Sequence, residues 1–156
     1  MITARPAGFG IRAVAAILDF VVFALVKLSL GVIAARVFGT DLDGALGVQG
    51  AVVGCTLLFA ALYVIGLHAL EGQTLGKLLV GVRVVGGDGT PPALGASVLR
   101  FFAYFVSLIP FGFGFFMAGL RADRRALHDL LAGTHVERLA GPVPQAPAPE
   151  SEELIA

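Results

Sequence analysis

The main pattern in this chain is a long apolar run over residues 10–38, interrupted by only four charged side chains, Arg12, Asp19, Lys27 and Arg36. At about 1.5 Å of rise per residue, this run forms a helix about 43 Å long, whereas the hydrocarbon core of a bilayer is about 30 Å thick. The pattern therefore predicts a membrane-spanning helix whose two ends reach the headgroups. A carboxylate inside such a helix is costly, so Asp19 needs a partner, water or a proton.

A cleavable signal peptide is the alternative for this first segment. The apolar core of a signal peptide is about 7–15 residues long and is followed by a cleavage site of small residues. The run in this chain is about twice that length and contains Asp19 and Lys27. We therefore interpret it as a retained membrane helix.

A second apolar run, over residues 44–67, contains no charged residue and predicts a second span. The connection 39–44, with the sequence GTDLDG, is too short for anything but a tight turn, so the second helix returns antiparallel to the first. Gly50 and Gly54 form a GxxxG pair, a spacing that lets another helix approach closely. Glycine is common here, at 21 of 156 residues, so chance explains the pair equally well. If the pair has a packing role, we favour packing within the chain over dimerisation.

The third apolar run lies between Arg100 and Arg121 and is also long enough to span a membrane. Pro110 and the sequence FGFG that follows stand at its middle, where proline and glycine kink or break a helix. The segment is therefore either a kinked span or a re-entrant hairpin.

Two short segments on either side of the third run have the pattern of strands. Within residues 70–95, the letters VGVRVV place β-branched residues in near alternation, and a turn sequence, GGDGTPP, follows. After the third run, a basic amphipathic helix ends at Gly133, and the letters THVER predict a second short strand. A re-entrant third segment would keep both strands on one side of the membrane and let them pair, so we favour it.

Positive charges predict the orientation, because cytoplasmic loops carry an excess of lysine and arginine. The residues that favour a cytoplasmic N-terminus and a cytoplasmic segment 70–95 are Arg5, Arg12, Lys77, Arg83 and Arg100. A continuous third span would place the basic cluster 121–125 outside, against this tendency. We predict a multi-pass protein of the cell membrane with its N-terminus in the cytoplasm.

The composition agrees with this class of protein. Hydrophobic residues make up 57% of the chain and charged residues only 14%, whereas a soluble domain has about 25% charged residues. The net charge is zero and no face carries a basic stripe, so we expect no nucleic-acid partner. We expect the lipid bilayer as a partner, with either a second copy of the chain or another membrane protein beside it.

The predicted fold is an all-α integral membrane protein with two transmembrane helices, a third apolar segment and a short cytoplasmic β-pair. It occupies one domain over residues 1–139. The proline-rich tail 140–156 is predicted to be disordered.

No pattern typical of an enzyme or a cofactor site is visible. Three scattered histidines and one cysteine do not have the spacing of a zinc site. The letters GQTLGK resemble a phosphate-binding loop, but three residues rather than four separate Gly72 from Gly76, and Leu78 follows the lysine. We therefore expect no enzymatic activity, no cofactor and no metal.

Four motifs in order resemble a known family. Arg12 begins the first helix and Asp19 lies inside it; GQTLGKLLVGVRVVGGDGT follows, Arg100 opens the third apolar run, and ALHDLLAGTHV contains Asp129. Over about residues 6–138 this arrangement resembles the RDD family of small integral membrane proteins, named for one arginine and two aspartates. The resemblance implies that Arg12, Asp19 and Asp129 occupy the naming positions. It also implies a role in transport, which for some members is cation/proton antiport.

Helix geometry gives expectations for these charged residues. Arg12 and Asp19 lie about 10 Å apart along one helix face, but helical side chains lean toward the N-terminus, so Arg12 points away from Asp19. We expect Arg12 to reach the headgroups as an anchor. Asp19 then needs a partner from another segment, for which Arg100 is the first candidate, followed by Lys27 or His68.

Two roles remain open for the carboxylates. Asp19 is either half of a buried ion pair that fixes the helix register or a titratable group that exchanges a proton for a cation. Asp129 either caps a helix or pairs with the basic cluster 121–125. The candidate functional residues are thus Arg12, Asp19, Arg100 and Asp129. The predicted function is transport, with cation/proton exchange the leading form; the alternative is a non-transporting structural or assembly subunit of a membrane complex.

Overall fold

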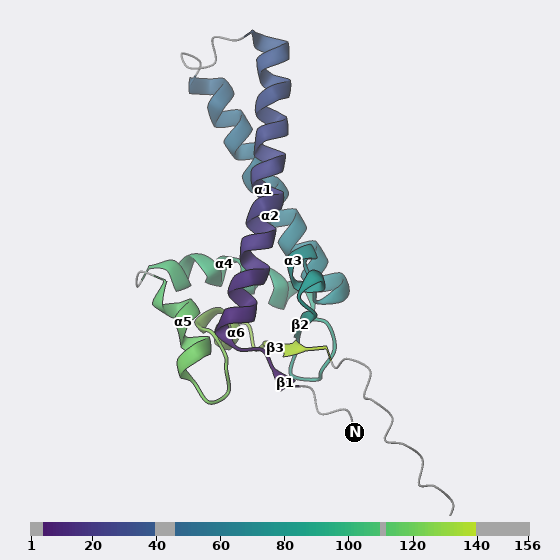
Figure 1. The fold of residues 1–156 in the computed structure, drawn as a ribbon, viewed down its shortest axis with the longest axis vertical. Helices are drawn as coiled ribbons and strands as arrows, with labels where there is room; N and C mark the ends of the chain where they lie inside the picture. The colour runs from purple at the N-terminus through teal and green to yellow at the C-terminus, as the bar shows by residue number, and fades with distance from the viewer. Residues whose placement is uncertain (1–4, 40–45, 110–111, 140–156) are drawn as a thin grey trace, which may run out of the picture.

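A hairpin of two long helices dominates the computed structural model, which describes residues 5–39, 46–109 and 112–139 (Figure 1). Helix α1 covers Phe9–Phe38 and helix α2 covers Leu46–Glu71, so their lengths are about 45 Å and about 39 Å. Both are long and apolar enough to cross a bilayer. The two predicted spans are therefore confirmed as helices, while the predicted turn at 39–44 lies almost wholly outside the described residues.

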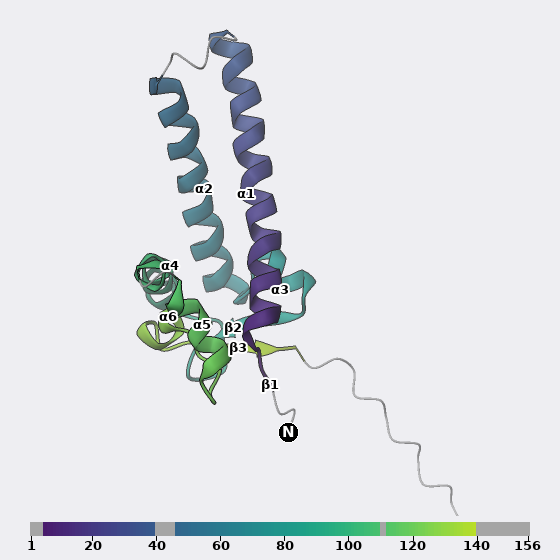
Figure 2. The ribbon, with the colours of Figure 1, turned by 60° about the vertical axis from the view of Figure 1, so that its left-hand side comes forward.

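The hairpin exposes apolar side chains on most of its surface. Its far half stands apart from every other described helix and strand in both views (Figures 1 and 2). The large apolar side chains that are more than half exposed in α1 are Ile17, Phe20, Val21, Leu25, Leu28, Val32, Ile33, Val37 and Phe38. This much exposed apolar surface is typical of a helix whose solvent is lipid.

The GxxxG pair, for which chance and a packing role were equally open, does not pack within the described part of the chain. Among the described residues, no atom lies within 4 Å of a Cβ built on Gly50 or Gly54. The two glycines face outward because α2 contacts α1 through a different stripe, which includes Phe59 and Tyr63.

The remaining elements gather at one end of the hairpin, which we call the base (Figure 2). They are the strands β1 (Arg5–Pro6), β2 (Val82–Val85) and β3 (His135–Arg138), and the helices α3 (Leu75–Leu79), α4 (Leu94–Leu108), α5 (Phe113–Leu120) and α6 (Leu127–Leu131).

The base contains a small antiparallel sheet with the strand order β1-β3-β2. Val84 pairs with Val136 in register, and these two side chains pack with Ala7 and Val82 in a buried apolar cluster. The pairing predicted for the two strands is confirmed, while β1 was not predicted, because Arg5 and Pro6 carry no strand pattern. Since β1 pairs with β3, the two ends of the described chain lie at the same end of the hairpin.

The third apolar run is not one straight helix. It forms α4 and α5, whose axes differ by 100°, and Pro110 lies between them outside the described residues. Helix α4 runs across the hairpin axis rather than along it: Figure 1 shows it from the side and Figure 2 nearly end-on. The predicted tail 140–156 lies outside the described residues.

Candidate functional site

Three of the four predicted residues meet in one buried cluster at the base. The carboxylate of Asp129 lies between the guanidinium groups of Arg12 and Arg100, and its side chain is fully buried. Arg12 Nη1 donates a hydrogen bond to Oδ2 of Asp129, and Arg100 Nη1 lies 2.5 Å from Oδ1. We call these three residues the ion cluster. It joins α1, α4 and α6, which are far apart in the sequence.

Each arginine of the ion cluster also donates hydrogen bonds to uncharged acceptors. Arg12 donates to the carbonyl oxygens of Ala7 at 3.1 Å and Arg124 at 2.7 Å. The expectation that Arg12 anchors in the headgroups is therefore wrong: the sheet and the start of α6 fold back over the first turn of α1 and bring Asp129 within its reach. Arg100 donates to Thr134 Oγ1 at 2.5 Å and to the Tyr104 hydroxyl at 3.2 Å.

Asp129 has the predicted capping role but not the predicted ionic partners. Its Oδ2 accepts the backbone N–H of Ala126 at 3.0 Å, which caps the start of α6. Within the basic cluster 121–125, Arg121 pairs instead with Asp123 at 2.8 Å. Burial alone would raise the pKa of Asp129, but the positive charge of Arg100 foremost, and that of Arg12, lowers it well below its usual range.

Asp19 lies apart from the ion cluster and binds only uncharged groups. It is 7% exposed. Its Oδ1 accepts hydrogen bonds from the Tyr63 hydroxyl at 2.8 Å and from the backbone N–H of Gly76 at 2.9 Å, and its Oδ2 accepts one from the Thr74 hydroxyl at 2.6 Å. Asp19 has no salt bridge to any residue in the described ranges. The expected partners Arg100, Lys27 and His68 are therefore wrong.

The GQTLGK segment is what brings these donors to Asp19. Gly72 has a φ of +69°, and a Cβ there would lie 2.2 Å from the carbonyl oxygen of Val84. Thr74 forms the N-cap of α3 and accepts from the backbone N–H of Lys77 at 3.4 Å. A Cβ on Gly76 would lie 2.1 Å from the carbonyl oxygen of Ala15 in α1. The segment therefore packs its backbone directly on α1 beside Asp19.

Sequence reasoning missed Tyr63, Thr74 and Gly76 as partners of Asp19. The signal that could have found Thr74 is its position: a threonine before a short apolar helix is a preferred N-cap. The first N–H groups of that helix then need acceptors, and a buried carboxylate is a suitable one. Tyr63 gives no comparable signal in the sequence, because it lies inside an apolar run.

The sequence profile of the RDD family matches residues 6–133. The chain belongs to the RDD family. Two relatives from Bacillus subtilis (strain 168) bear the names uncharacterized protein YckC and uncharacterized protein YxaI. The first is 33% identical over 137 residues, covering 85% of this chain and 84% of the relative; the second is 29% identical over 147 residues, covering 85% and 97%. No solved structure matches the chain significantly.

This RDD protein also buries polar groups that the two carboxylates do not use. The ring of His68 is fully buried, and neither ring nitrogen has a hydrogen-bond partner in the part of the chain that the structure describes. Burial lowers the pKa of Lys77, and it lowers that of His128 well below its usual range, with Arg100 the next cause. The ring of His128 lies 4.6 Å from that of Tyr104, which bonds to Arg100. These residues continue the polar interior of the base.

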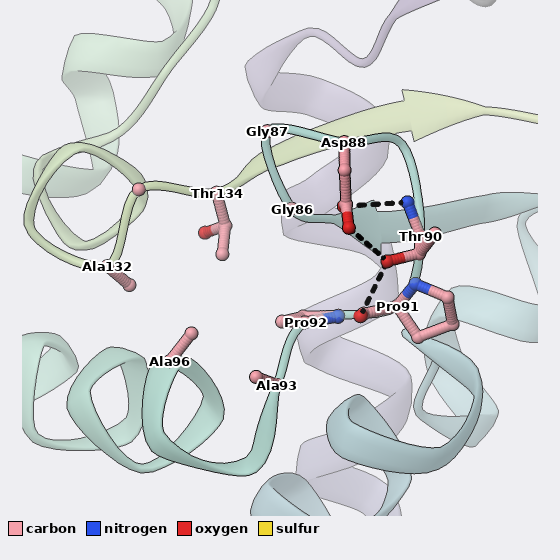
Figure 3. A pocket seen from close by; sticks show the side chains of 11 residues that line it. Gly86, Gly87, Asp88, Thr90, Pro91, Pro92, Ala93, Ala96, Ala132 and Thr134 are labelled. Carbon is pink, nitrogen blue, oxygen red and sulfur yellow. Dashed lines mark hydrogen bonds between the residues drawn. The ribbon is translucent and has the colours of Figure 1, made fainter.

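A pocket of about 350 Å³ opens beside the ion cluster of the RDD fold (Figure 3). Its walls are the loop between β2 and α4, the first turn of α4, and the turn before β3. Figure 3 shows the Thr134 side chain pointing into it, and the same hydroxyl accepts the hydrogen bond from Arg100. Asp88 closes the loop by accepting from the N–H and hydroxyl of Thr90 at 3.1 Å and 2.9 Å.

The base has no grouping suited to a metal ion. No set of three or more histidine, cysteine, aspartate or glutamate side chains is close enough together in residues 5–39, 46–109 and 112–139.

Proposed function

We propose that this RDD protein exchanges protons for small cations across the membrane, with Asp19 as the exchanging carboxylate. The observation that carries this proposal is the surroundings of Asp19: a nearly buried carboxylate in a membrane helix, with three uncharged donors and no salt bridge among the described residues. These donors stabilise the carboxylate only in part because none of them is charged, and a proton or a bound cation would balance the remaining charge.

The contrast between the two aspartates supports this assignment. Two guanidinium groups hold Asp129 ionised, so it is a poor proton carrier at neutral pH. The hydroxyls of Tyr63 and Thr74 can both donate and accept hydrogen bonds. They therefore suit either state of Asp19: they donate to the carboxylate, and they can turn to accept from the protonated acid.

The base would lie in the cytoplasm, and the protein in the cell membrane. Besides the two arginines of the ion cluster, the basic side chains at the base are Arg5, Lys77, Arg83, Arg121, Arg124, Arg125 and Arg138, which agrees with the excess of positive charge on cytoplasmic segments. One copy provides two spanning helices, so a second copy or another membrane protein would complete a path past Asp19.

The test is proton flux in vesicles that contain the purified protein, in the presence of Na⁺, K⁺ or Li⁺. We expect the unmodified protein to move protons when a cation gradient is applied, and Asp19→Asn to lose that flux, because the amide cannot bind a proton or balance a cation. Asp123→Asn is the matched control, since Asp123 forms an exposed pair with Arg121. Equal flux from Asp19→Asn and unmodified protein, at equal incorporation, would contradict the proposal.

A second candidate function is a non-transporting subunit that assembles with another membrane protein. The exposed apolar surface of the hairpin, with Gly50 and Gly54 open on it, favours this role. It predicts that purification in mild detergent yields a second membrane protein in fixed stoichiometry. It also predicts no cation-dependent proton flux from the purified chain alone.

A further inference from the structure

Helix α4 has two opposite faces, and the polar one is turned inward. Its buried residues are Ser97, Arg100, Ala103 and Ser107, which recur every three or four positions and form one stripe. Most of its large exposed residues form the opposite stripe, which the C-cap residue Ile109 continues: Leu94, Leu99, Phe102, Phe105 and Val106; the exposed Leu108 lies at the edge of the buried stripe. A helix at a water-facing surface has the reverse arrangement, with its apolar stripe toward the core.

The exposed apolar surface continues from α4 onto α5. Phe113, Phe116 and Leu120 are each more than half exposed, while Gly114 and Ala118 are buried against the rest of the base. Immediately after α5, the polar pair Arg121 and Asp123 is exposed. The apolar surface therefore ends where α5 ends.

Helix α4 is too short and wrongly directed to cross a bilayer. Its 15 residues extend about 22 Å, less than the roughly 30 Å of the hydrocarbon core. It lies across the axis of the α1–α2 hairpin (Figures 1 and 2). Helix α5 then turns by 100° and returns to the start of α1, where the Phe116 ring stacks on that of Phe9 at 4.8 Å.

The ion cluster holds α4 at the same depth in the membrane as the first turn of α1. Arg100, in the middle of α4, shares Asp129 with Arg12, which lies in the first turn of α1. Helix α1 extends about 45 Å, more than the roughly 30 Å of the hydrocarbon core, so its first turn reaches the boundary between headgroups and acyl chains. Helix α4 therefore lies at that boundary as well, and its apolar stripe points away from the base.

We propose that α4 and α5 lie within one leaflet and do not form a third crossing. In this arrangement the apolar stripe of α4 is immersed in the acyl chains of the leaflet next to the sheet, as in interfacial amphipathic helices. Its polar stripe holds Arg100 against Asp129. The partner of this surface is the acyl-chain region of lipid, with which the exposed sides of α1 and α2 are continuous. The inference does not depend on the transport function proposed above.

Tryptophan fluorescence can measure this placement, because the chain contains no tryptophan. The test uses three single variants on the apolar face, Leu94→Trp, Phe102→Trp and Ile109→Trp, in vesicles of lipids brominated at shallow or deep acyl positions. Phe20→Trp, in the exposed part of α1 about 15 Å beyond its first turn, is the reference for the membrane centre. All four side chains are more than half exposed, so the larger ring displaces little of the chain.

We expect the three α4 variants to be quenched alike, at least about twofold more by the shallow than by the deep bromines, because an interfacial helix inserts its apolar face by about 5–10 Å. Phe20→Trp should show the reverse preference. A steady change in preferred depth from position 94 to position 109 would mean that α4 crosses the membrane. Absence of quenching at all three positions would mean that the face is in water, and either result would overturn the proposal.

Discussion

The two buried carboxylates of this RDD protein have different partners: one is paired with cationic side chains and the other is not. Asp129 lies between Arg12 and Arg100, whereas Asp19 accepts only from uncharged donors. A buried ion pair contributes little net stability, but removing one partner leaves an uncompensated charge. The ion cluster should therefore respond to substitution through stability, and Asp19 through function.

Asp129→Asn is expected to destabilise the fold by about 3–5 kcal/mol, because it leaves two buried guanidinium groups without their carboxylate. Unfolding in detergent, followed by circular dichroism against increasing denaturant, measures the loss. Asp123→Asn, in an exposed pair, should leave the midpoint almost unchanged. Similar midpoints for the two variants would refute a central structural role for the ion cluster.

The pKa of Asp129 also gives this stability a pH dependence. Because the folded pKa lies below its ordinary value, the group stabilises the fold above about pH 4 and loses that contribution as the pH falls through the folded pKa. Acid titration of the unmodified protein should show this loss below about pH 4. An equally steep acid transition in Asp129→Asn would assign it to another group.

Among the helices and strands, the closest backbone contact near Asp19 is made by the GQTLGK segment, which packs the start of α3 against α1. The backbone of Gly76 approaches Ala15 so closely that no side chain fits between them. That contact brings the N–H of Gly76 to Asp19. The geometry around the carboxylate therefore depends on a glycine rather than on a charged residue.

Gly76→Ala is expected to push α3 away from α1 and to destabilise the fold by about 1–3 kcal/mol, because the new methyl group would overlap the Ala15 carbonyl. Gly95→Ala in α4 is the control, since its Cβ meets nothing within 4 Å among the described residues. Alanine there should be neutral or stabilise the helix by about 0.5 kcal/mol. Equal effects of the two substitutions on the unfolding midpoint would contradict the close contact.

The sequence predicted elements well and side-chain partners poorly, for a physical reason. The long apolar runs that form α1 and α2, and the β-branched run that forms β2, are local patterns. The pairing of Arg12 with Asp129 joins residues 117 positions apart and depends on how the sheet closes over α1. The prediction that Arg12 does not pair with Asp19 followed from side-chain direction, yet the true partners of Asp19 include a backbone N–H, which no residue type reveals.

In the complete fold, the hairpin of α1 and α2 rises from the base, whose interior is polar (Figure 2). The sheet, the ion cluster and the donors to Asp19 all lie in the base, while the far half of the hairpin is exposed apolar surface. Asp19 is the point where the two parts meet, because it lies in α1 and accepts from α2 and from α3. A change in the charge of Asp19 would therefore alter hydrogen bonds in both the hairpin and the base.

In the exchange proposed above, a cation binds at the carboxylate of Asp19. Infrared difference spectroscopy of the protein in lipid vesicles, on adding Na⁺, K⁺ or Li⁺ near neutral pH, tests it most directly. We expect cation binding to change the carboxylate bands of the protein, the change to be absent in Asp19→Asn, and the change to persist in Asp123→Asn. A spectrum that no cation changes, or a change that survives Asp19→Asn, would contradict it.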